Sequence, residues 1–176
     1  IYNYWVVVDG IPHVARLERY GLDFGYTNDP SAIVAIYYYN GGYILDQITY
    51  QHGLSNKRLA DILISIDRSL VIADSAEPKS IDEIMSYGVN IQPSQKGPGS
   101  VNQGIQYVQD QKISVTKRSV NIIHEYRNYL WKVDKDGRVL NEPEHTYSHS
   151  QDAIRYAMTS LIPILRRKEY IENLPS

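Results

Sequence analysis

The sequence predicts an α/β fold with a mixed central β-sheet flanked by helices and an additional β-hairpin. Residues 20–50 contain runs rich in β-branched and aromatic side chains, separated by the glycine turn at 40–42, which favours an antiparallel meander. From residue 55 onward, helical periodicity alternates with short apolar runs, which is typical of parallel strand pairing. An Asp-Gly pair at 136–137 lies within an alternating segment and predicts the hairpin.

Length and composition narrow the possible classes of protein. A chain of 176 residues is expected to form one domain around a single core. With 43% apolar and 22% charged residues, it is close to globular averages, which excludes a disordered or fibrous chain. No stretch is apolar enough to span a bilayer, and residues 1–10 lack a secretory signal, so we expect a soluble protein. The absence of cysteine excludes thiolate catalysis, zinc fingers and iron–sulfur clusters.

The first third of the chain supplies the strands of the meander. Residues 1–16 are predicted as a lead-in segment with a short strand and a turn, and the domain is placed at 17–176. Strands are then expected around Leu22–Phe24 and over 32–39 and 43–50.

The middle of the chain predicts alternating helices and strands. Ser55 can cap a helix with an apolar face at three- and four-residue spacing, followed by an apolar strand at 70–74. Pro78 can begin a second helix that ends at Gly88, and a strand is expected over 89–91. Residues 92–100 contain two prolines and two glycines and predict a flexible loop.

The last third combines helices with the hairpin. Helices are predicted over 101–109 and 120–130, with an extended segment at 113–115 and the hairpin at 131–140. Ser148 and Gln151 have capping-box spacing before a final helix, whose apolar face is predicted to reach Ile164. Pro163 is expected to bend this helix or to begin a new turn.

The charge is unevenly distributed. The net charge of −2 argues against a nucleic-acid coat protein. Between residues 112 and 138, however, seven basic and three acidic residues give a local charge of +4, which leaves −6 for the remainder. This pattern suits an enzyme that gathers cations in one place and phosphates in another, and it suits a solvated helix and hairpin equally well.

Three acidic residues fall at notable positions. Asp23 lies in a strand, Asp74 ends an apolar strand, and Asp152 begins the last helix. Each has an ordinary explanation as a turn, cap or helix-dipole residue. Carboxylates in apolar strands are nevertheless costly unless they are paired or bind metal, so together the three indicate a shared cation site. His149 would share a helix face with Asp152, although a surface histidine explains it as well.

Other phosphate chemistries lack their motifs. The chain has no GxxxxGK[ST] loop, no GxGxxG after a strand and no GxSxG elbow. Residues 23–27 are similar to the first phosphate loop of actin-like ATPases, but the segment Asp74-Ser75-Ala76-Glu77 lacks the glycine that a second loop requires.

Three sequence blocks carry a family resemblance: Gly21-Leu22-Asp23-Phe24-Gly25-Tyr26-Thr27-Asn28-Asp29-Pro30, Ile72-Ala73-Asp74-Ser75-Ala76-Glu77-Pro78, and Ser148-His149-Ser150-Gln151-Asp152-Ala153-Ile154-Arg155-Tyr156. Their order resembles the ribonuclease H-like nuclease fold. Their residues are similar to those of the C-terminal nuclease domain of large terminase subunits of tailed bacteriophages, of the SPP1 type. The resemblance covers about residues 17–165.

The resemblance implies an endonuclease that cuts concatemeric double-stranded viral DNA during packaging. Asp23, Asp74 and Asp152 would hold two Mg²⁺ or Mn²⁺ ions about 4 Å apart, with Asp23 bridging them. His149 matches a further position near the metals, where it could bind metal, orient water or protonate the leaving oxygen. Glu77 and Asp29 could support these residues from behind.

The resemblance also implies partners and a location. An ATPase motor domain precedes the nuclease in this family, so residues 1–16 would be a linker remnant of an excised module. The full-length protein would work with the small terminase subunit and the portal of the procapsid, in the host cytoplasm and without a membrane. Cutting without base choice relies on phosphate contacts, for which Lys96, Lys132, Lys135 and Arg138 are the expected DNA-binding residues.

Two other interpretations stay open. A non-catalytic nucleic-acid-binding module would use the basic stretch 112–138 and the loop 92–100. A resolvase- or integrase-like nuclease core would instead prefer branched DNA or recombination ends. Cation binding near the acids, together with cation-supported cleavage, separates the endonuclease from the binding module.

Overall fold

A mixed sheet forms the centre of the molecule. The computed structural model describes residues 1–162, and within them the sheet has the strand order β1-β7-β4-β3-β2-β5-β6. Its strands are β1 (Val6–Val8), β2 (Arg16–Asp23), β3 (Ser31–Tyr39), β4 (Gly42–Gln51), β5 (Val71–Ala73), β6 (Ile91–Pro93) and β7 (Ile113–Thr116). Strands β2, β3 and β4 pair antiparallel, and the outer strands pair parallel. The predicted α/β fold class is therefore confirmed.

The meander follows from its sequence. Asn40 and Gly41 join β3 to β4 with φ of 49° and 76°, in the left-handed region that these two residue types tolerate best. Along β3, Ala32, Val34 and Ile36 belong to one core cluster, whereas Ile33 and Ala35 belong to the other. Both faces of the central strands are thus buried, which explains why β3 is almost continuously apolar.

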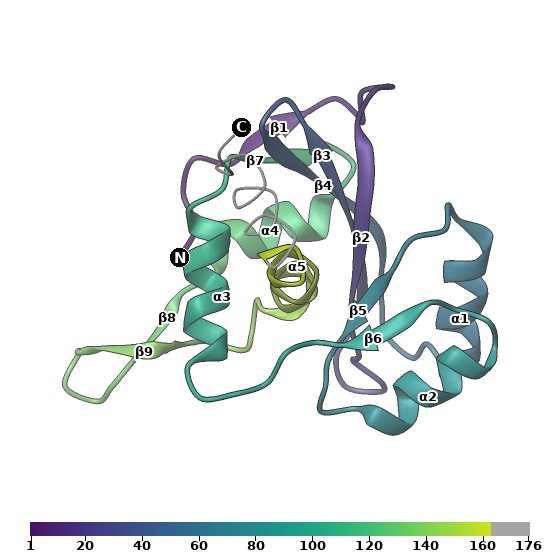
Figure 1. Ribbon diagram of the computed structural model, residues 1–176. Helices are drawn as coiled ribbons and strands as arrows, with labels where there is room; N and C mark the ends of the chain where they lie inside the picture. The colour runs from purple at the N-terminus through teal and green to yellow at the C-terminus, as the bar shows by residue number, and fades with distance from the viewer. Residues whose placement is uncertain (163–176) are drawn as a thin grey trace, which may run out of the picture.

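Helices cover both faces of the sheet (Figure 1). Helices α1 (Asn56–Ser65) and α2 (Pro78–Ser86) pack on one side, and α3 (Ser100–Gln109), α4 (Val120–Asn128) and α5 (His149–Thr159) pack on the other. The Ser55 side chain accepts a hydrogen bond from the Arg58 amide at 3.1 Å, so the predicted cap of α1 is confirmed. The predicted helix over 120–130 ends two residues early, and the predicted strand over 89–91 is observed at 91–93.

The last helix lies very close to the sheet. A Cβ on Gly21 of β2 would stand 1.9 Å from the carbonyl oxygen of Ala153 in α5. Glycine at this position therefore lets the backbone of α5 rest directly on β2. The predicted contributions of Pro163 and Ile164 to this helix lie outside the described residues.

The N-terminal segment joins the same sheet. Residues 1–16, predicted as a lead-in to the domain, supply β1, which pairs parallel with β7. Tyr2 is buried, with its ring 5.7 Å from that of Tyr129. The first residues thus contribute to the core on the side of α3, α4 and α5.

The predicted hairpin forms a separate two-stranded sheet. Strands β8 (Trp131–Val133) and β9 (Val139–Pro143) pair antiparallel and project from the body of the molecule (Figure 1). Gly137 in the turn has a φ of 80°, which explains the glycine there. In the part of the chain that the structure describes, no helix has the length and apolarity needed to span a bilayer.

Candidate metal centre

Adjacent strand ends bring two of the predicted acids together. Strands β2 and β5 pair parallel, with Leu22 opposite Ala73. Asp23 and Asp74 each follow this pair, so both leave the sheet at the same edge. Register alone therefore places two carboxylates that are 51 positions apart in the sequence side by side.

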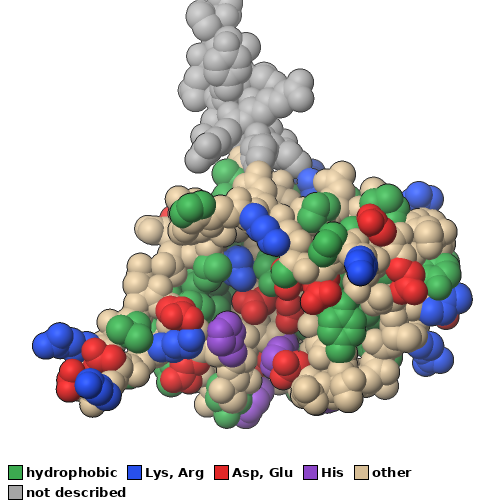
Figure 2. Space-filling view, turned by 90° about the horizontal axis from the view of Figure 1, so that it is seen from below, with side chains coloured by type: hydrophobic (Ala, Val, Ile, Leu, Met, Phe, Trp, Pro, Cys, Tyr) green, Lys and Arg blue, Asp and Glu red, His purple; other side chains and the backbone are tan. Residues whose placement is uncertain are grey.

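Helix α5 brings the third acid and the histidine. His149 and Asp152 lie in its first turn, which the close contact between Gly21 and Ala153 holds against β2. Asp23, Asp74 and Asp152 line one cavity of about 500 Å³. Its other walls include residues from the end of the 92–100 loop and the start of α3, residues 141–143 of β9, and His145. The structure thus brings the three predicted acids to one cavity, and His149 lies beside it. Viewed from this side, acidic and histidine side chains gather in the middle of the face (Figure 2).

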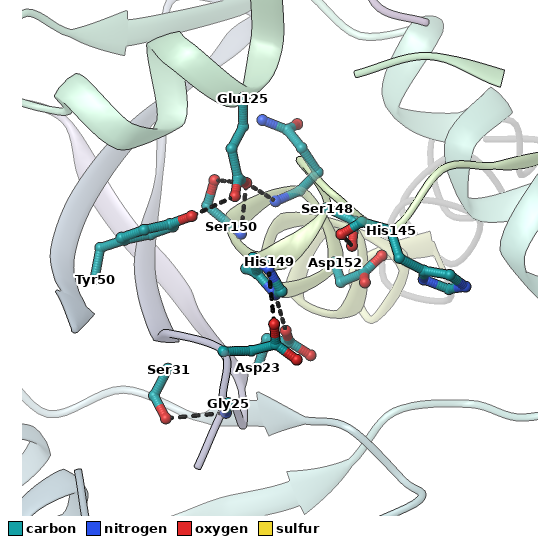
Figure 3. A network of polar contacts seen from close by, with 12 residues as sticks. Asp23, Gly25, Ser31, Tyr50, Glu125, His145, Ser148, His149, Ser150 and Asp152 are labelled. Atoms are coloured by element: carbon teal, nitrogen blue, oxygen red, sulfur yellow. Dashed lines mark hydrogen bonds and ion pairs between the residues drawn. The ribbon is translucent and has the colours of Figure 1, made fainter. Parts of the chain in front are cut away.

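His149 points at Asp23 (Figure 3). Its Nδ1 lies 3.8 Å from Asp23 Oδ2, and its Nε2 lies 3.7 Å from Asp29 Oδ1. The neighbouring Asp23 carboxylate raises the pKa of His149 above its ordinary value, against the opposing effect of burial. His149 is therefore part of the acidic site, and Asp29 lies behind it as expected.

Asp23 is a buried acid whose charged form is disfavoured in the metal-free fold. It is 8% exposed, and its pKa is raised to about 7, chiefly by burial. The charges of Asp152 and Asp74 contribute to this rise, whereas His149 opposes it. Repulsion among buried carboxylates is the condition that a bound cation relieves.

Asp152 forms an ion pair with the guanidinium of Arg155. Arg155 Nη2 lies 3.1 Å from Asp152 Oδ1 and opposes the rise in the pKa of Asp152 that burial causes. The guanidinium also stacks 4.9 Å from the centre of the Tyr156 ring, and its stem fills the space left by Gly104 of α3. Tyr156 in turn donates a hydrogen bond of 3.5 Å to Asp23. Sequence reasoning missed Arg155 and Tyr156, although both lie in the third quoted block.

The donor set fits a hard divalent cation. Carboxylate oxygens are the ligands that Mg²⁺ and Mn²⁺ prefer, and the charges of Asp152 and Asp74 add to the effect of burial in raising the pKa of Asp23. Within residues 1–162, no three Asp, Glu, His or Cys side chains are grouped closely enough to hold an ion. One oxygen of Asp152 is engaged by Arg155 in this arrangement.

The remaining acids have local partners. Asp74 Oδ1 accepts a hydrogen bond from the Ala76 amide at 2.9 Å, which fixes the turn after β5. Glu77 accepts from the Tyr26 hydroxyl at 2.8 Å. It therefore holds the loop after β2 rather than the carboxylates themselves.

The predicted DNA-binding residues lie on the loop beside the cavity and on the hairpin. Lys96 is exposed on the loop whose Gly97 and Gly99 line the cavity. Lys135 and Arg138 are exposed near the hairpin turn, whereas Lys132 is paired with Glu142 across the hairpin. Basic side chains are visible at the projecting end of the hairpin at the left of Figure 2.

The capping of α5 differs from the prediction. Ser148 precedes the helix, but its hydroxyl donates to the carbonyl of His145 and makes no cap. The Glu125 carboxylate of α4 accepts from the Ser150 amide instead, at 2.8 Å. The capping-box prediction is therefore wrong, because a carboxylate 25 residues away takes the position of the local side chain.

Comparison with known proteins shows the family of this chain. A family model described as a terminase RNAseH-like domain matches residues 23–160, a range that contains all three acids and His149. The chain belongs to this family.

Relatives of the terminase domain are found among phage proteins. The large terminase subunit of Bacillus phage SPP1 is 37% identical over 155 residues, which cover 82% of this chain and 36% of that protein. The PBSX phage terminase large subunit of Bacillus subtilis is 30% identical over 150 residues, which cover 80% of this chain and 34% of the relative. The chain thus spans about a third of the length of these relatives.

Solved structures confirm the ribonuclease H-like terminase nuclease fold. The nuclease domain of the SPP1 large terminase, solved with bound Mn, has a TM-score of 0.74 and 31% identity, with 88% of this chain and 94% of that chain covered. The large terminase of a thermophilic bacteriophage also has a TM-score of 0.74, at 19% identity, over 89% of this chain and 42% of its own. The second likeness concerns the fold alone.

Proposed function

We propose that this terminase domain is a metal-dependent endonuclease that cuts concatemeric double-stranded DNA during viral genome packaging. The observation that carries the proposal is the convergence of Asp23, Asp74 and Asp152 on one cavity. The Mn-bound nuclease domain from phage SPP1 supports a role for divalent cations. The other curated relatives and the family model support the place in packaging.

The three carboxylates would hold two Mg²⁺ or Mn²⁺ ions, with Asp23 between Asp74 and Asp152. Such ions, when bound, make a nucleophile of water and stabilise the departing 3′ oxygen. The protein contributes negative charge concentrated in a partly buried cavity, and Arg155 keeps the Asp152 carboxylate oriented. His149, between Asp23 and Asp29, is placed to accept or return a proton through its ring nitrogens.

DNA would approach along the side of the cavity bordered by the loop and the hairpin. Lys96 is exposed on the loop, and Lys135 and Arg138 are exposed near the hairpin turn. These three side chains would contact phosphates without reading bases. Lys132 would contribute less, because Glu142 already neutralises it. In the full-length protein, an ATPase motor domain, the small terminase subunit and the portal would bring DNA to this domain in the host cytoplasm.

A plasmid-cleavage assay tests the proposal. We expect cleavage with Mg²⁺ or Mn²⁺, none with chelator, and at least a hundredfold loss in Asp23→Asn, Asp74→Asn and Asp152→Asn, each of which should remain folded. Asp82→Asn, an exposed acid on α2, is the matched control and should cleave normally. DNA binding without any cation-dependent cleavage would establish the non-catalytic module instead. A strong preference for branched over plain duplex would indicate the resolvase-like core.

A further inference from the structure

A buried carboxylate outside the cavity holds the helix that carries two site residues. Glu125 of α4 is 1% exposed, and four hydrogen bonds reach its side chain (Figure 3). Its Oε1 accepts from the Ser150 amide at 2.8 Å, the Gln151 amide at 3.3 Å and the Ser150 hydroxyl. Its Oε2 accepts from the Tyr50 hydroxyl of β4 at 2.8 Å. One carboxylate therefore joins α4, α5 and β4.

The hydrogen bonds fall on the amides that a helix start leaves unpaired. The first amides of a helix have no partner within it, and a negative charge there is favoured by the helix dipole. Because Ser148 turns to the carbonyl of His145, it leaves these amides to Glu125. The Gln151 side chain adds a second link, since its Nε2 donates to the carbonyl of Ile122 in α4 at 3.4 Å.

The hydrogen bonds of Glu125 to α5 and to Tyr50 both lead to residues beside the candidate metal centre. Ser150 and Gln151 lie between His149 and Asp152, so their amides fix the turn that presents both side chains. On the other branch, the Tyr50 ring packs edge-on against the His149 ring, with centroids 6.5 Å apart. A shift of Glu125 would therefore move both residues relative to Asp23.

We propose that Glu125 is a positioning residue for the metal centre, which holds the first turn of α5 so that His149 and Asp152 face Asp23 and the bound cation. The proposal rests on the proposed metal-dependent function. It predicts that changes at Glu125 weaken metal binding beyond any general loss of stability. Partners that orient metal ligands from behind commonly change metal affinity 10- to 100-fold.

Mn²⁺ titration by calorimetry, with unfolding measured alongside, tests the proposal without DNA. We expect Glu125→Ala to weaken Mn²⁺ affinity about tenfold. Glu125→Gln, which keeps the shape and an accepting oxygen, should stay within about threefold of the wild type. In Glu125→Asp the shorter side chain draws the carboxylate away from α5. The Mn²⁺ affinity of this variant should lie between those of the Ala and Gln variants.

Asp46→Asn is the matched control. Asp46 is also a buried carboxylate, 2% exposed. It accepts hydrogen bonds from Thr116, the last residue of β7, and from Arg118 just after it, rather than from α5. Its replacement should lower stability and leave Mn²⁺ affinity within about threefold of the wild type.

The outcomes separate a failure of the proposed function from a failure of the proposed role of Glu125. A wild-type domain that does not bind Mn²⁺ would overturn the proposed function itself. If the wild type binds, wild-type affinity in Glu125→Ala, or equal losses in Asp46→Asn, would reduce Glu125 to a structural cap. Equal losses in the Gln and Ala variants would also overturn the proposal, because charge rather than hydrogen-bond geometry would then be responsible. Should Glu125→Ala fail to fold, wild-type affinity in a folded Glu125→Asp would overturn it.

Discussion

At Asp23, burial and the charges of Asp74 and Asp152 act in the same direction. Its pKa rises from 3.8 to about 7, so the metal-free folded state binds this proton more tightly than the unfolded state does. The resulting stability is complete below pH 3.8 and is lost as the pH rises through about 7. An ionised Asp23 without a cation therefore destabilises the fold at neutral and higher pH.

Asp23→Asn should separate stability from function. Without metal at pH 8, we expect the variant to be more stable by about 2 kcal/mol, since one pKa unit corresponds to about 1.4 kcal/mol and the lost contact with His149 offsets part of the gain. Cleavage should disappear. Thermal unfolding at pH 5 and pH 8 checks this, and a gain that does not grow with pH would contradict the electrostatic explanation.

His149 should titrate as a partner of Asp23. Its pKa is raised by the Asp23 carboxylate, so in the metal-free domain its ring resonances should titrate above 6.5 in NMR. Its contribution to stability is then full below pH 6.5 and is lost as the pH rises through the folded pKa. Asp23→Asn or added Mg²⁺ should lower the pKa. If the pKa of His149 changed neither in Asp23→Asn nor with Mg²⁺, His149 would be an ordinary surface residue.

Among the elements, α5 depends most on one contact with the sheet. Gly21→Ala places a Cβ 1.9 Å from the Ala153 carbonyl oxygen, and backbone must move to accommodate it. We expect a loss of about 3 kcal/mol in denaturant unfolding and weakened Mn²⁺ binding. Gly10→Ala, where no atom lies within 4 Å of the added Cβ, should change little. Wild-type stability in Gly21→Ala would show that α5 is not seated on β2.

The hairpin offers an element-scale test of DNA contact. Lys135→Ala with Arg138→Ala should reduce the slope of log affinity against log salt by about 0.9 for each lost phosphate contact. Lys132→Ala should have a smaller effect because Lys132 pairs with Glu142. Arg58→Ala with Lys79→Ala, on α1 and α2 across the sheet, is the control. An equal change in both pairs would indicate general charge rather than a hairpin contact.

Local patterns predicted most elements, whereas the contact between α4 and the start of α5 was missed. The cap of α1 and the turn at Asn40 and Gly41 depend on residues within four positions, so the sequence contains the whole signal. The capping of α5 by Glu125 depends on how α4 packs, which periodicity does not report. A glutamate on an otherwise apolar helix face was the available signal.

At the scale of the whole molecule, the predicted acids meet because of topology. The sequence singled out Asp23 within a strand, Asp74 at a strand end and Asp152 at a helix start, and parallel pairing of β2 and β5 explains why the first two meet. Arg155 could not be assigned in advance, since its burial depends on the space left by Gly104 in α3. The pairing of β1 with β7 likewise joins segments more than 100 residues apart.

Metal should stabilise the whole domain in a pH-dependent manner. At a free concentration of 100 times its Kd, a cation that binds only the folded state adds about 2.7 kcal/mol. We expect Mn²⁺ to raise the Tm by several degrees at pH 8 and by less at pH 6, because a proton on Asp23 competes with the ion. Chelator should reverse the shift, and Asp23→Asn should lack it. A shift that is equal at both pH values would mean that the ion binds elsewhere.

The seating of α5 on β2 has a consequence for the growing chain on the ribosome. Tyr156 and Asp23, which the fold brings into contact, are 133 positions apart. Asp23 and Asp74 are synthesised long before the helix that completes their surroundings, and contacts of such separation form late in folding. A nascent or prematurely terminated chain therefore carries two of the acids without a working cavity. The proposed nuclease activity would therefore arise only when nearly the whole domain has been made.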